Sequence, residues 1–174
     1  MSRRFIKRKS GLTLIETVVY VLLFALLAMA VMQVLLVLSK SFSHARDIRG
    51  LTAGATASFE RMTREIELAD TIVTAESVFG SSPGTLVVQY VGPDDVTKTE
   101  KFYRGTDGDL LVQENSGTPY PLTPSDIDVS SLVFRQITSA SSSAIKIELT
   151  LEKAGATSTR ASYYVTSVLR GTYE

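Results

Sequence analysis

Apolar residues follow three successive patterns along this chain. From Thr17 to Leu38 the sequence has no charged residue, and only Tyr20 and Gln33 are appreciably polar. At 1.5 Å per residue, a helix of these roughly 22 residues is about 33 Å long, which is enough to cross the apolar core of a bilayer. The first pattern therefore predicts a transmembrane or lipid-buried helix.

The second pattern has apolar or small residues at spacings of three and four. They are Phe42, Ala45, Ile48, Thr52, Ala55, Phe59, Met62, Ile66 and Ala69. Charged residues occupy the other faces, and the pattern ends at Asp70-Thr71. This spacing is typical of an amphipathic helix. We expect one helix from about residue 13 to residue 70, with an apolar stripe in its second half that can lie along a sheet.

Two glycines, Gly50 and Gly54, interrupt this second half. Each costs about 1 kcal/mol relative to alanine inside a helix. One explanation is a locally flexible segment that lets a subunit bend within a filament. The other is close packing against a neighbouring element.

Beyond residue 70 the period changes to two, which is typical of strands. The predicted strands are Thr71–Thr74, Thr85–Val91, Thr99–Arg104, Asp109–Glu114, Leu132–Ile137, Ala144–Leu151 and Thr159–Leu169. Hairpin turns are expected at Thr106–Asp109, which contains an Asp-Gly pair, and at Lys153–Ala156. The predicted fold class is α+β, with a long N-terminal helix packed on a mainly antiparallel sheet.

The segment before the helix is strongly basic. Its five basic residues, Arg3, Arg4, Lys7, Arg8 and Lys9, precede any acidic residue. Short positively charged flanks stay on the cytoplasmic side of a membrane, so the N-terminus is predicted to be inside and the C-terminus outside.

Glu16 is unusual because it lies at the start of the apolar stretch. A carboxylate in lipid costs about 2 to 3 kcal/mol or more unless a partner neutralises it. Cleavage after Gly11 would supply one, because the new α-amino group of Leu12 would lie one helical turn from Glu16. That amine could pair within its own chain or with a neighbouring copy. The alternative is that Glu16 lies at the membrane interface, where an acid at the helix N-terminus interacts favourably with the helix dipole and contacts water.

The motif formed by these residues is Gly11-Leu12-Thr13-Leu14-Ile15-Glu16, followed by the apolar helix. It resembles the processing and assembly signature of type IV pilins and type II secretion pseudopilins. The resemblance implies a leader of residues 1–11, cleavage between Gly11 and Leu12 by prepilin peptidase, N-methylation of Leu12, and a subunit-registration role for Glu16. Leu12 departs from the usual phenylalanine of the family.

The resemblance also implies a domain organisation and a set of partners. A helix of residues 12–70, transmembrane over residues 12–38, would precede a β-rich head of residues 71–174. The expected partners are prepilin peptidase, other pilin or pseudopilin subunits, an inner-membrane assembly platform and the lipid bilayer. Chain length, a head without disulfides and the ending Thr166–Arg170 resemble most a minor pseudopilin of the J type. The expected location is the bacterial cytoplasmic membrane, and then a pilus or pseudopilus.

Two other classes of protein fit parts of the sequence. One is a single-pass anchored binding or adhesion module that does not polymerise, although such an anchor has no use for Glu16. The other is a secreted head released at Ser43–Ala45. The apolar stretch from Thr17 to Leu38 exceeds the 7 to 15 residues of a typical signal-peptide core, which disfavours secretory cleavage.

Composition and spacing predict no enzyme, cofactor or metal site. The chain has no cysteine, and its single histidine, His44, is expected on a solvated helix face. The aspartates suited to calcium are Asp94 with Asp95, Asp107 with Asp109, and Asp126 with Asp128, but none has the spacing of a defined calcium loop. Without the leader, 13 basic residues remain of 18, against 18 acidic residues. This balance does not favour nucleic-acid binding.

Overall fold

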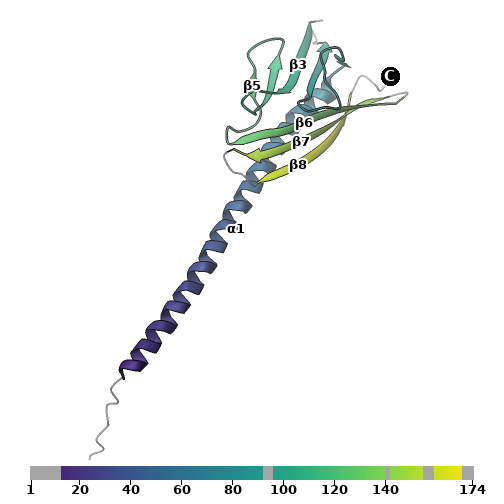
Figure 1. Ribbon diagram of the computed structural model, residues 1–174. Coiled ribbons are helices and arrows are strands. Elements are labelled where there is room, and N and C mark those ends of the chain that lie inside the picture. Colours follow the sequence, from purple (N-terminus) through teal and green to yellow (C-terminus); the bar gives the residue numbers. More distant parts are fainter. Residues whose placement is uncertain (1–12, 92–95, 140–141, 155–158, 170–174) are drawn as a thin grey trace, which may run out of the picture. The chain divides into compact units, whose positions relative to one another are not determined.

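The computed structural model describes residues 13–91, 96–139, 142–154 and 159–169. In these ranges a single long helix, α1 (Leu14–Leu68), precedes eight strands (Figure 1). The chain divides into two compact units between Ser43 and His44, so α1 contributes to both. The coarse class, α+β with a long apolar N-terminal helix and antiparallel strands, is confirmed.

The second unit contains two antiparallel sheets, where the sequence predicted one. The larger sheet has the order β1 (Thr71–Ile72), β2 (Thr85–Val91), β3 (Thr97–Arg104), β4 (Leu110–Glu114) and β5 (Tyr120–Pro121). The smaller has the order β6 (Ile127–Thr138), β7 (Ser143–Lys153) and β8 (Arg160–Val168). The larger sheet ends at β5, where Pro121 has no N–H to donate to a further ladder.

Turns connect β3 to β4 and β7 to β8, and the first of them matches the predicted Asp-Gly turn. Between β3 and β4 the Gly105 N–H donates to the Asp109 carbonyl at 2.8 Å, and Gly108 has φ 94°. Glycine adopts this positive φ without steric cost, which explains the Asp-Gly pair. Between β7 and β8 the Lys153 N–H donates to the Thr159 carbonyl at 3.1 Å, and Gly155 and Ala156 of the predicted turn lie outside the described residues.

One hydrophobic core joins the second half of α1 to both sheets. Met62 and Ile66 from the helix, Phe102 from the larger sheet and Phe134 from the smaller sheet are all fully buried in it. On β7 the apolar set Ile145, Ile147, Leu149 and Leu151 is buried. The opposite face of that strand is partly exposed and carries Lys146 and Glu148, as the alternation predicted.

The buried face of α1 differs from the predicted stripe. The buried helix residues are Leu51, Gly54, Ala55, Ser58, Met62, Glu65 and Ile66. Phe42, Ala45 and Thr52, which were expected on the stripe, are exposed. The prediction counted only apolar spacing, whereas the face that packs on the strands also holds a glycine, a serine and a glutamate.

Of the two explanations for the helix glycines, close packing fits Gly54. A Cβ at Gly54 would lie 3.0 Å from Ile127 Cδ1 and 3.6 Å from Pro124 Cδ, so the loop before β6 approaches the helix backbone closely. A Cβ at Gly50 would meet nothing within 4 Å.

This difference predicts opposite responses to alanine. Gly50→Ala should raise the free energy of unfolding of the second unit by about 1 kcal/mol, because it only improves helix propensity. Gly54→Ala should raise the free energy of unfolding by less than this, or lower it, because the Ile127 side chain must move to make room for the new Cβ. Urea unfolding of the full chain in detergent, followed by tyrosine fluorescence, measures both variants. Equal gains at the two positions would contradict close packing at Gly54.

Candidate functional site

The candidate site is the start of α1, where Thr13 caps the helix. Thr17 N–H donates to the Thr13 carbonyl at 3.2 Å, and Glu16 N–H reaches the Thr13 hydroxyl oxygen at 3.4 Å. Thr13 thus occupies the N-cap position and Glu16 the third helical position. A hydroxyl at this place satisfies one of the free N–H groups of the first turn.

The carboxylate of Glu16 is exposed and has one partner in the structure. The Tyr20 hydroxyl, one turn further along, donates to Glu16 Oε1 at 3.3 Å. Among the described residues Glu16 makes no ion pair. A carboxylate can accept several hydrogen bonds, so this single hydroxyl leaves most of the acceptor capacity of Glu16 unused.

The two processing residues, Gly11 and Leu12, lie outside the described residues. Cleavage between them, methylation of Leu12 and pairing of its amine with Glu16 stay predictions. Sequence reasoning named Glu16 but overlooked Thr13 and Tyr20. The signal for Thr13 was present, because Thr-x-x-Glu before an apolar run is the pattern of a capping box.

The first half of α1 exposes its side chains on every face. All residues from Thr13 to Arg46 are exposed, among them Leu14 at 82% and Phe24 at 73%. By length and composition this helix could cross a membrane, and none of its apolar window is buried. A continuous apolar surface of this size needs lipid or protein around it.

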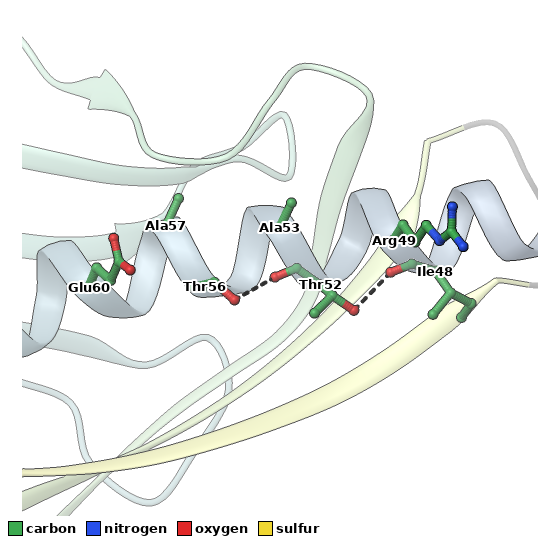
Figure 2. Close-up of a pocket in the computed structure, with 7 residues that line it drawn as sticks. All are labelled: Ile48, Arg49, Thr52, Ala53, Thr56, Ala57 and Glu60. Carbon is green, nitrogen blue, oxygen red and sulfur yellow. Dashed lines mark hydrogen bonds between the residues drawn. The ribbon is translucent and has the colours of Figure 1, made fainter.

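A hollow lies along α1 in the second unit, and Figure 2 shows the residues that line it. Its lining residues are Ile48, Arg49, Thr52, Ala53, Thr56, Ala57 and Glu60. The Thr52 and Thr56 hydroxyls donate at 2.9 Å to the carbonyls of Ile48 and Thr52, each one turn back. Both hydroxyls thus bond to the helix backbone, and the Thr52 hydroxyl also lies 3.0 Å from the Tyr163 hydroxyl of β8.

The other candidate residues do not converge. His44 is exposed, and its Nδ1 lies 3.4 Å from the Thr159 hydroxyl. Asp126 pairs with Lys153. Within the described ranges no three metal-binding side chains gather, and Asp94 and Asp95 lie outside those ranges.

No protein-family model, curated protein or solved structure matches this chain.

Proposed function

We propose that this chain is a structural subunit, of the minor kind, in a type IV pilus or type II secretion pseudopilus. Prepilin peptidase cleaves it after Gly11, and it assembles through its N-terminal helix. The observation that carries the proposal is Glu16, an exposed carboxylate at the start of a helix whose following stretch, Thr17 to Leu38, is exposed, uncharged and almost entirely apolar.

The energetics of Glu16 favour assembly over a solitary anchor. In lipid, a carboxylate with one tyrosine hydroxyl as its partner is under-satisfied, and a cationic group from another chain would relieve that cost. The amine of Leu12 on a neighbouring subunit has the opposite charge. Docking would fix the axial register of two subunits, while apolar packing between helices Leu14–Leu38 supplies contact area.

The proposed setting follows from the charge before the helix. The basic residues up to Lys9 hold the N-terminus on the cytoplasmic side, and the second unit then lies outside the cytoplasmic membrane. The partners are prepilin peptidase, other pilin or pseudopilin subunits, the inner-membrane assembly platform and the bilayer. In this role the chain serves as a building block and catalyses no reaction.

The cap at the helix start favours a second candidate, a single-pass anchored binding module. Thr13 and Glu16 occupy the two positions of a capping box, which gives Glu16 a local use at a membrane interface. In this account the helix remains a monomeric anchor, and Glu16 has no intermolecular partner.

Substitution of Gly11 tests the proposal. In cells with active prepilin peptidase, Gly11→Ala should be cleaved more completely than Gly11→Trp, because the peptidase site needs a small side chain. The fraction of chain that begins at Leu12, measured by mass spectrometry, gives the result. Equal processing of the two variants would contradict the proposal. So would the absence of processing in the unmodified chain.

A further inference from the structure

The second unit contains three carboxyls around one arginine, and two of the three are buried. Arg61, on α1, forms ion pairs with Glu65 at 3.1 Å, with Glu100 at 3.0 Å and with Glu114 at 3.1 Å. The Glu65 and Glu100 side chains are only 8% and 2% exposed, whereas Glu114 is half exposed. Two carboxyls from different elements therefore share one guanidinium inside the helix–sheet contact.

The hydrogen bonds of Glu100 are incomplete if both buried carboxyls are ionised. Glu100 Oε1 accepts from Arg61 Nη2, but Glu100 Oε2 is buried and receives no hydrogen bond from the described residues. The other buried carboxyl, Glu65, pairs with the second terminal nitrogen of the same guanidinium, Arg61 Nη1. A hydrogen bond between two carboxyls requires that one of them carries a proton. A single proton would thus satisfy the buried oxygen and remove the repulsion.

Other ionisable groups that face this pair do not remove the excess negative charge. Glu114 on β4 adds a third carboxylate, and its Oε1 accepts from the Tyr120 hydroxyl of β5 at 2.9 Å. Tyr90 on β2 contributes a neutral phenol. Lys98 lies two residues from Glu100 on the same face of β3, and its ammonium makes no ion pair with the described residues. Arg61 is therefore the one cation in contact with three carboxyls in this part of the structure.

We propose that Glu65 and Glu100 share one proton that fastens α1 to β3, and that loss of this proton above neutral pH loosens the helix–sheet contact. The contact involved lies wholly within the second unit, so the proposal does not depend on filament assembly. It makes this junction a pH-sensitive device, tight in mildly acidic surroundings and weaker in alkaline ones.

The direction of the pH effect follows from the ionisation of Glu100. Burial, with the Glu65 carboxylate as the second cause, raises the pKa of Glu100 from 4.5 to about 7, although Arg61 acts in the opposite direction. Below pH 4.5 the folded and unfolded chains both hold the proton, and the stabilisation is complete. As the pH rises toward about 7 the unfolded chain releases the proton first, so stability falls. Above that range both forms are ionised and the effect levels off.

Stability measured against pH tests the proposal in the full chain in detergent. Between about pH 5 and about pH 7 the unfolding equilibrium constant of the second unit should rise by up to about tenfold per pH unit, which corresponds to one proton. Hydrogen exchange, corrected for its intrinsic pH dependence, should show the loss of protection in α1 residues 51–68 and in β3. No pH dependence in this range would overturn the proposal.

Three matched variants identify the group. Glu100→Gln and Glu65→Gln each remove one of the two carboxyls, so both should flatten the pH dependence. Glu148→Gln alters a glutamate whose pKa is lowered by its hydrogen bonds to Arg135 and Lys146, so it should keep the wild-type slope over this range. Retention of the slope in both Glu100→Gln and Glu65→Gln would refute the shared proton.

A direct measurement covers the case in which a variant does not fold. Infrared spectra of the unmodified chain in D₂O at about pH 6 should contain the carbonyl stretch of a protonated carboxyl, and this band should disappear by about pH 8.5. Its absence at the lower pH would overturn the proposal independently of any substitution.

Discussion

Glu16→Ala is expected to reduce incorporation of the chain into filaments by about thirtyfold to 150-fold. An unpaired carboxylate costs roughly 2 to 3 kcal/mol in lipid, and docking would relieve this free energy. Membrane insertion and cleavage after Gly11 should remain. The measurement is the ratio of chain in sheared filaments to mature chain in membranes, with the assembly machinery present.

Glu16→Gln separates the two roles open to this residue. Glutamine fills the third position of a capping box and can accept the Tyr20 hydrogen bond, but it cannot attract an amine by charge. Registration predicts that Glu16→Gln fails like Glu16→Ala, whereas a purely local cap predicts near-normal behaviour. Glu67→Ala, an exposed acid elsewhere on α1, is the control and should assemble normally. Normal incorporation of Glu16→Ala would count heavily against registration.

Phe134→Ala should lower the free energy of unfolding of the second unit by about 3 to 5 kcal/mol. Phe134 is fully buried on β6, stands opposite Ile147 of β7, and lies beside Gly84, where a Cβ would come within 3.1 Å of its ring. Its removal would leave a cavity between the smaller sheet and the segment before β2.

Tyr164→Ala provides the matched control on the same sheet. Tyr164 is 64% exposed, and its ring lies 5.4 Å from the Lys146 ammonium, so its loss should cost no more than about 1 kcal/mol. Urea unfolding of both variants at fixed pH gives the comparison. A cost below about 1 kcal/mol for Phe134→Ala would contradict the core described above.

Elements with a regular pattern were predictable from the sequence. β2 was predicted with its observed bounds, and α1 within two residues at each end, because periodicity alone determines such segments. β6 was predicted to begin at Leu132 but begins at Ile127. A bulge between Val129 and Ser131 shifts the alternation by one residue, so the two halves of this strand do not share one period.

Features that depend on tertiary contacts were not predictable. β5 contains only Tyr120 and Pro121, and neither its length nor its proline indicates a strand. Glu65 and Ser58 are buried on α1, although neither belongs to the predicted apolar stripe. Glu65 pairs there with Arg61, which also pairs with Glu100 of β3. An inward position for Glu100 could have been inferred from its alternation with Phe102 on β3.

The candidate site was identified by residue type more than by structure. Gly11, Leu12 and Glu16 came from the order of basic segment, glycine, glutamate and apolar helix. The structure adds the Thr13 cap and the Tyr20 hydroxyl, and it places the carboxylate on an exposed apolar helix. Pairing between chains is a property of an assembly, so a single chain contains no contact that could report it.

Intact mass and N-terminal sequence of the chain recovered from membranes, with and without active prepilin peptidase, test the central claim most directly. The account predicts a chain that begins at methylated Leu12 only when the peptidase is present. A chain that begins at Met1 or Ser2 in both conditions would contradict it and would favour the anchored binding module, with Glu16 serving only the helix cap.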